Sequence, residues 1–242
     1  RQVDLTPFAV LSLIANAVST YGAKELIPLL GVLVLSYVLC AIQMFLIDGA
    51  LIRFAGGLSP IRFFRGFWPA QVVAFTSQSS VGTIPVSVKQ LVSRLGVNED
   101  IASFVAALGA NLGMPACAGI WPTLLAVLAI NIFDIPYSIG QYAFLIVLTL
   151  IVSIGTVGVP GTSTVTTTAL FTAAGLPVEI IVLLVPISSV VDMMRTAANV
   201  TGAATAAVLV AKSEQLLDRE VYDQGKSEEG LSGAVAVGES AR

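Results

Sequence analysis

Residues 191–202 read VDMMRTAANVTG and set one acid and one base three positions apart inside a long apolar segment. No other charged residue occurs from Ile180 to Ala211. Positions i and i+3 of a helix share a face, so Asp192 and Arg195 would lie together, and Asn199 would extend the stripe. Ionised side chains at membrane depth are costly and usually face a partner, a cavity or a ligand. The stripe predicts either a site for a zwitterion, such as an amino acid, or an internal ion pair that joins two helices.

The composition indicates an all-α integral membrane protein. Of the 242 residues, 56% are hydrophobic and only 11% are charged, whereas soluble domains carry about 25% charged residues. Lipid cannot satisfy unpaired backbone groups, which favours helical spans. The sequence lacks histidine, so a proton relay would depend on carboxylates. The two cysteines, Cys40 and Cys117, lie in apolar segments and suggest neither a disulfide framework nor a metal site.

Charged residues divide the chain into spans. The uncharged or nearly uncharged runs 5–23, 26–52, 101–133 and 180–211 are each long enough to cross a bilayer, which needs about 20 residues. Two further runs contain turn-forming residues at their centres. Run 135–178 would be about 66 Å long as one helix, twice the hydrocarbon thickness, so it must break. We therefore predict two helical hairpins, over 66–88 and 135–178.

The basic residues predict how these segments sit in a membrane. If both hairpins are re-entrant, eight basic residues fall on one side and only Lys24 falls opposite. The eight are Arg53, Arg62, Arg65, Lys89, Arg94, Lys212, Arg219 and Lys226. The positive-inside rule then places the C-terminus in the cytoplasm. Two hairpins that enter from opposite sides form an inverted repeat, a pattern typical of secondary transporters, although re-entrant loops also occur in channels.

Three motifs carry a resemblance to a known family. They are SQSSVGTIP at 77–85, GTVGVPG at 155–161 and DMMRTAANVTG at 192–202. The chain resembles the dicarboxylate/amino acid:cation symporters, the family of glutamate transporters and their bacterial homologues, from about the fifth transmembrane helix onward. The resemblance implies a homotrimer in the cell membrane with elevator-type transport. It assigns residues 1–25 to a scaffold helix, 26–212 to the transport domain, and 213–242 to a polar tail that we expect to be disordered beyond about Asp223.

The resemblance also implies the roles of individual residues. Asp192 would bind the substrate amino group, Arg195 a distal carboxylate and Asn199 the α-carboxylate. The implied substrate-binding residues are Ser79, Ser80, Cys117, Val159, Gly161, Ser163, Asp192, Arg195, Thr196 and Asn199. The implied cation-binding residues are Gly109, Asn111, Gly113, Ser153, Ile154, Thr156 and Asn199. The coupling ion is expected to be Na⁺ or H⁺, with no other cofactor.

The chain departs from the family pattern where sodium would bind. Sodium-coupled members carry Asn-Met-Asp-Gly-Thr in the seventh helix, but Gly113 and Pro115 stand here in place of the asparagine and aspartate. A second family aspartate falls on Ala203. Two carboxylates that suit hard cations are therefore absent. The choice between Na⁺ and H⁺ stays open on the sequence.

Residues 109–122, GANLGMPACAGIWP, are similar to the L-cystine symporter branch of the family. The expected function is therefore L-cystine import. An acidic amino acid or C4-dicarboxylate symporter, an uncoupled anion channel and a substrate sensor remain alternatives. The sequence offers no nucleophile–base pair, metal cluster or nucleotide loop, so we expect neither an enzyme nor a nucleic-acid-binding protein.

Overall fold

The computed structural model describes residues 26–112, 114–154, 158–159 and 161–224, and the regular structure of these residues is helical apart from one isolated bridge between Val97 and Leu217. The predicted scaffold helix within residues 1–25 and the end of the tail lie outside the described residues. Two of the described helical segments, Leu29–Ala55 and Pro115–Ile132, are long and apolar enough to cross a membrane. The helix Ile139–Ser153 is apolar but shorter.

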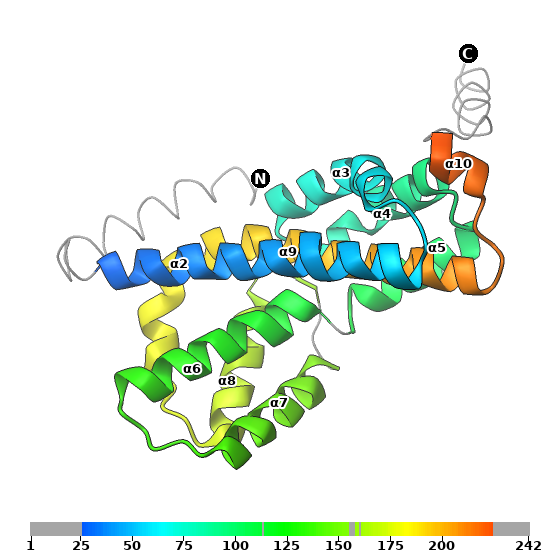
Figure 1. Cartoon of the computed structure of the whole chain (residues 1–242). Coiled ribbons are helices and arrows are strands. Elements are labelled where there is room, and N and C mark those ends of the chain that lie inside the picture. The colour runs from blue at the N-terminus through cyan, green and yellow to red at the C-terminus, as the bar shows by residue number, and fades with distance from the viewer. Residues whose placement is uncertain (1–25, 113, 155–157, 160, 225–242) are drawn as a thin grey trace.

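The first described span and the last long helix lie side by side. The span comprises α2 (Leu26–Ala41) and two π-helical segments, η2 (Ile42–Asp48) and η3 (Leu51–Ala55). It packs along α9 (Glu179–Ser213), and both run in the same direction (Figure 1). The predicted helices over 26–52 and 180–211 correspond to these two elements.

The predicted hairpin over 66–88 consists of α3 (Pro60–Ser77) and α4 (Ser80–Leu95), which pack against each other. Helix α3 ends at Gln78, whose φ of 55° is left-handed. Helix α4 begins at once, because the Ser79 hydroxyl accepts a hydrogen bond of 3.0 Å from the Gly82 amide. Serine is a favoured N-cap because its side chain satisfies an amide that lacks a helical partner. The tip of this hairpin is thus a two-residue turn with a capped helix behind it.

The predicted single helix over 101–133 is wrong in one respect, because the chain breaks in its middle. It divides into α5 (Glu99–Gly109), η4 (Pro115–Ile120) and α6 (Trp121–Ile132). Proline lacks an amide hydrogen and disfavours the helical conformation of the preceding residue. Met114 accordingly has an extended ψ of 102°, and Pro115 opens η4. At the break, the Ala110 oxygen and the Ala116 amide form hydrogen bonds outside their own helices.

The predicted hairpin over 135–178 contains α7 (Ile139–Ser153) and α8 (Thr162–Ala174). Ser138 and Gln141 form a reciprocal capping box at the start of α7, which stabilises a helix N-terminus. Helix α8 begins after Gly161, where φ is +85°. The short helix α10 (Arg219–Gln224) follows α9, and its Tyr222 is buried, so the start of the predicted tail packs on the helices.

Two apolar clusters make up most of the core, and α9 passes through both. One cluster includes the first part of α9, Ile180 to Val191, together with residues of α2, α6, α7 and α8. The other includes the last part, Val200 to Ala211, with residues of η3, α3, α4 and α5. Figure 1 shows these two groups of helices on opposite sides of the α2–α9 pair. The charged stretch of α9 lies between the two clusters.

We expect Gly96→Ala to destabilise the protein by about 3 kcal/mol. Gly96 has a φ of +66°, and an added Cβ would lie 2.2 Å from the backbone oxygen of Asp218. Gly175 provides the matched control, because its φ is +68° and its Cβ would meet no atom within 4 Å. Gly175→Ala should therefore lower the free energy of unfolding by only about 1–2 kcal/mol, which is the strain of the left-handed conformation. Thermal unfolding of the detergent-solubilised protein would measure both changes, and equal shifts would contradict the predicted clash.

Candidate functional site

The tips of the two hairpins and the break between α5 and η4 meet through backbone hydrogen bonds. The Val81 amide donates to the Gly158 oxygen over 3.1 Å, and the Gly158 amide donates to the Ala110 oxygen over 2.8 Å. The Ser79 hydroxyl also lies 3.4 Å from the Gly158 oxygen. A Cβ on Gly158 would stand 2.5 Å from the Ala110 oxygen, so only glycine allows this approach without a shift.

A small cavity of about 10 Å³ lies beneath these tips, on the charged stretch of α9. Its lining combines both hairpin tips, η4 with the residue before it, and α9. The lining residues are Gln78, Ser80, Met114, Cys117, Gly158, Val159, Thr162, Asp192 and Thr196. Five of the predicted substrate-binding residues are among them: Ser80, Cys117, Val159, Asp192 and Thr196. The sequence did not single out Gln78, Met114 or Thr162; the left-handed turn at Gln78 is a structural signal that only the fold reveals.

Asp192 is the acidic group of this cavity. Its Oδ1 lies 3.1 Å from Arg195 Nη2 and 3.7 Å from the Cys117 sulfur. The Gly161 backbone also hydrogen-bonds to the carboxylate. The carboxylate thus has partners from its own helix, from η4 and from the turn before α8. Asp192 is 6% exposed and faces the cavity.

Arg195 does not line the cavity and is completely buried. Its guanidinium carbon lies 4.5 Å above the Trp121 ring, and Nη2 donates to the Ser188 oxygen over 3.2 Å. A cation over an indole face is favourable. Its Nε and Nη1 have no hydrogen-bond partner among the described residues, which leaves donors for a ligand group. The contact with Trp121 was not predicted, since the sequence did not decide between an interface and a core position.

Asn199 joins α9 to the start of η4. Its Oδ1 accepts from the Ala116 amide over 2.9 Å and from the Cys117 amide over 3.4 Å. These amides belong to the first turn of η4, where backbone donors lack helical partners. The asparagine therefore caps the broken helix, and its Nδ2 has no partner within the described part of the chain. Nearby, Ser163 is buried, and its hydroxyl likewise lacks a partner there.

The structure does not test the predicted cation-binding residues as a set. Asn111 Nδ2 donates to the Ala107 oxygen, and the Ser153 hydroxyl donates to the Leu150 oxygen, so both bind their own helices. Ile154 is largely exposed. Two further members of this set, Gly113 and Thr156, lie outside the described residues. The cation roles stay predictions.

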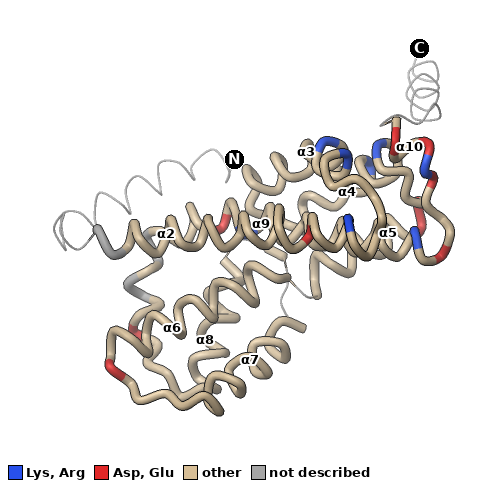
Figure 2. Tube along the Cα trace, in the orientation of Figure 1, with Lys and Arg blue, Asp and Glu red and all other residues tan. Residues whose placement is uncertain are grey.

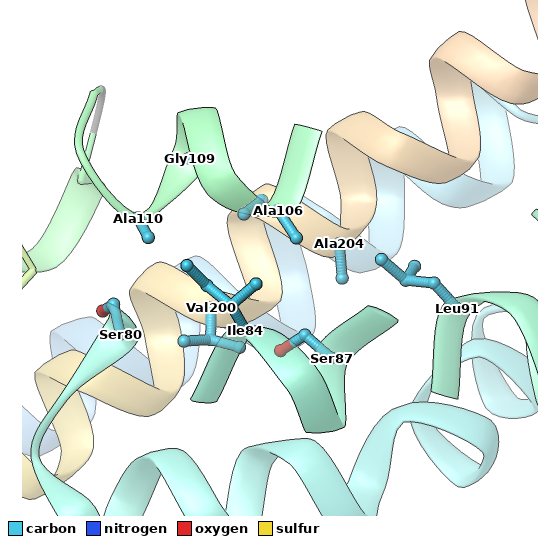
Figure 3. A pocket seen from close by; sticks show the side chains of 10 residues that line it. Ser80, Ile84, Ser87, Leu91, Ala106, Gly109, Ala110, Val200 and Ala204 are labelled. Atoms are coloured by element: carbon cyan, nitrogen blue, oxygen red, sulfur yellow. The ribbon is translucent and has the colours of Figure 1, made fainter. Parts of the chain in front are cut away.

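Gly109 lies against Ala203, where the family pattern has an aspartate. A Cβ on Gly109 would come within 2.5 Å of the Ala203 Cβ. Both residues line a second small cavity, of about 10 Å³, between α4, α5 and α9. Figure 3 shows its wall of small and apolar side chains, with the hydroxyls of Ser80 and Ser87 as its polar groups. This cavity offers no carboxylate to a cation.

Comparison with known proteins agrees with this architecture. A family model, described as the sodium:dicarboxylate symporter family, matches residues 3–213. The chain belongs to the sodium:dicarboxylate symporter family. The family's members are transporters rather than enzymes, and the predicted resemblance is confirmed.

Curated relatives narrow the comparison within the family. The chain is 34% identical over 227 residues to an L-cystine uptake protein TcyP of Bacillus cereus, covering 93% of this chain and 48% of that protein. It is 36% identical over 219 residues to the protein of that name from Shouchella clausii, covering 90% and 46%. An uncharacterized symporter of Haemophilus influenzae is 35% identical over 218 residues, covering 90% and 48%. The chain spans about half the length of these relatives.

We expect Asn199→Ala to lower stability by about 1–3 kcal/mol, because it leaves the buried amides of Ala116 and Cys117 without their acceptor. Thr196→Ala is the matched control. Thr196 is equally buried, but its hydroxyl only adds a second donor to the Asp192 carbonyl, four residues earlier on the same helix. Removing the Thr196 hydroxyl should therefore lower stability less than Asn199→Ala does. Thermal unfolding of the two variants would compare them, and a larger loss in Thr196→Ala would refute the capping role of Asn199.

Proposed function

We propose that this chain forms the substrate-binding part of a secondary active amino-acid:cation symporter that imports L-cystine. The observation that carries the proposal is the cavity bounded by both hairpin tips, with the Asp192 carboxylate in its wall. A buried carboxylate suits an ammonium group, because charge-assisted hydrogen bonds are the strong ones. The names of the curated relatives favour cystine as the amino acid.

Substrate would bind with its amino group on Asp192 and a carboxylate near the tip of the first hairpin. Ser80 lines the cavity at the start of α4, where the positive end of the helix dipole favours an anion. The unpartnered donors of Arg195 and Asn199 lie on the same helix as Asp192 but outside the cavity lining, so the second carboxylate of cystine would reach them only if the cavity widened. We assign the other predicted residues, Ser79, Gly161 and Ser163, to the closed hairpin tips around the ligand.

The hairpins would be re-entrant, and residues 26–212 would move as one transport domain. The distribution of charge supports this orientation, because basic residues of the described part gather toward the end of the molecule where α10 lies, whereas two acids mark the opposite end (Figure 2). Contacts hold the basic end together: Arg62 pairs with Asp223, and Lys212 Nζ lies 3.5 Å from the Ala55 oxygen. The positive-inside rule would place this end, and the tail 213–242, in the cytoplasm.

A homotrimeric assembly in the cell membrane, with residues 1–25 in the scaffold, completes the proposal. The cation would be Na⁺ or H⁺. Ala203, which lines the apolar cavity, and Pro115 stand where sodium-coupled members carry aspartates. Two carboxylates that a sodium site would use are therefore absent. Fewer cation sites than in sodium-coupled members would therefore operate.

The decisive experiment is uptake of labelled cystine by the full-length carrier in proteoliposomes. Under an inward sodium or proton gradient we expect accumulation above the equilibrium level, because symport couples the two flows. Unlabelled cystine, aspartate, glutamate and succinate would then compete in turn. Equilibration without accumulation under every gradient would favour a channel instead, and stronger competition by aspartate or succinate would favour an acidic amino acid or a C4-dicarboxylate.

Asp192→Asn should weaken cystine binding at least tenfold, because a charged hydrogen bond contributes about 1.5–3 kcal/mol. Binding of succinate, if it is measurable, should weaken less, since succinate has no amino group. The ratio of the two inhibition constants therefore serves as an internal control for general damage to the site. An unchanged cystine constant in this variant would remove Asp192 from amine recognition.

A further inference from the structure

A second buried polar group lies away from the substrate cavity, between η2, α3 and α9. We call it the polar seam and define it as Gln43, Asp48, Gln71, Thr201 and Thr205. Gln71 Nε2 donates to the Thr201 hydroxyl over 2.8 Å, and Gln43 Nε2 lies 3.3 Å from Asp48 Oδ1. Asp48 is 2% exposed. Thr205 lies thirteen residues beyond Asp192, about 20 Å along the helix at 1.5 Å per residue.

Three oxygens of the seam lack hydrogen-bond partners among the described residues. They are Asp48 Oδ2, Gln71 Oε1 and the Thr205 hydroxyl, and all three are buried. Buried polar atoms are nearly always hydrogen-bonded, so each exception requires an explanation. An ionised carboxylate with a single hydrogen bond is especially costly in a low-dielectric interior.

The helices place these groups at two neighbouring heights, about one turn apart. The Thr201 hydroxyl lies 3.6 Å from the sulfur of Met44, which fixes α9 against η2 at this height. Asp48 and Thr205 each follow four residues later on helices that run in the same direction. On the other side, a Cβ on Gly49 would lie 3.6 Å from the Phe64 ring of α3. The neighbours of Asp48 on its own span, Met44 and Gly49, thus contact α9 and α3, and the side chain of Asp48 is buried.

No basic side chain pairs with Asp48 among the described residues. On α3, Arg62 and Arg65 are exposed, and Arg62 pairs with Asp223. Arg53 of η3 is exposed as well. On α9, Arg195 pairs with Asp192, and Lys212 reaches the Ala55 oxygen.

The titratable residues of α2, Tyr37 and Cys40, lie eight or more positions before Asp48 on the same span. The Tyr37 hydroxyl donates to the Val190 oxygen, and Cys40 lies in an apolar cluster with Met44 and Ala197. The carboxyl group therefore lacks a countercharge from every element packed against it.

We propose that Asp48 binds the coupling proton of the transport cycle; this inference rests on the proposed symport function. A proton on Oδ2 turns the orphan acceptor into a donor, and Gln71 Oε1 and the Thr205 hydroxyl supply unused acceptors in the seam. Protonation of Asp48 also removes the buried charge before the transport domain, residues 26–212, moves. The proton arrives from the external phase and leaves to the cytoplasm, and no other bond changes. A sodium ion would need more oxygen ligands than the three unpartnered ones.

The test compares the full-length carrier with its Asp48→Asn variant in two proteoliposome assays. The first measures cystine accumulation under an inward proton gradient without sodium. The second measures exchange of external labelled cystine for internal unlabelled cystine, which needs no net proton movement. We expect Asp48→Asn to lose gradient-driven accumulation at least tenfold and to keep exchange within about twofold. Asp134→Asn, a change to an exposed acid at the opposite end, should behave like the original protein in both assays.

Accumulation by Asp48→Asn at the original level would overturn the proposal, as would an original carrier that responds to a sodium gradient but not to a proton gradient. Failure of the original protein to exchange cystine or any competing substrate would instead refute the proposed function, since exchange does not depend on the coupling ion.

Gln43→Leu keeps the carboxyl group and removes only the N–H that hydrogen-bonds to it, so it remains informative if Asp48→Asn does not fold. Because that bond favours the charged form, its loss should move the pH midpoint of uptake upward by about 0.5–1 unit. An unmoved midpoint would contradict proton binding at Asp48.

Discussion

The arrangement of the helices depends on burying one ion pair, Asp192 and Arg195, in the middle of a 35-residue helix. Removing two charges from water costs several kcal/mol per ion, which only good geometry and further contacts offset. Here the offset comes from neighbouring elements: the Trp121 ring lies under the guanidinium, the Ser188 carbonyl accepts from it, and Cys117 approaches the carboxylate. The contacts of Cys117 and Trp121 with this ion pair therefore fix the positions of η4 and α6 against α9.

The position of this pair between two apolar clusters explains how one helix serves both stability and binding. The two ends of α9 are held by separate cores, so the polar segment between them can keep imperfectly satisfied groups without loss of the fold. Functional sites often carry such local costs, which the surrounding structure supports. The unpartnered atoms of Arg195, Asn199 and Asp48 are of this kind. Substrate would bind on α9 and the proton on η2, and the contact of Thr201 with Met44 joins these two helices.

The sequence predicted the features that follow from local chemistry. The i, i+3 spacing gave the Asp192–Arg195 pair, and the length of the uncharged run 135–178 required a break. Hydropathy predicts a single helix over 101–133, whereas the break before Pro115 follows from the rule for residues that precede proline, which applies to Met114. The contact of Trp121 with Arg195 and the exclusion of Arg195 from the cavity depend on packing between distant elements, which no local pattern encodes. The cation roles of Asn111 and Ser153 came only from resemblance, and their side chains bind their own helices.

The contact between the hairpin tips has a consequence for how readily the cavity opens. Two main-chain hydrogen bonds of Gly158 join the tips to each other and to Ala110, and a net contribution of about 1 kcal/mol each would favour the closed arrangement only about thirtyfold. Thermal motion alone would then separate the tips in a few per cent of molecules. These hydrogen bonds use backbone atoms, so substitutions of the lining side chains would change the ligand preference of the cavity without removing the bonds. The same contact between hairpin tips could therefore occur in carriers of different specificity.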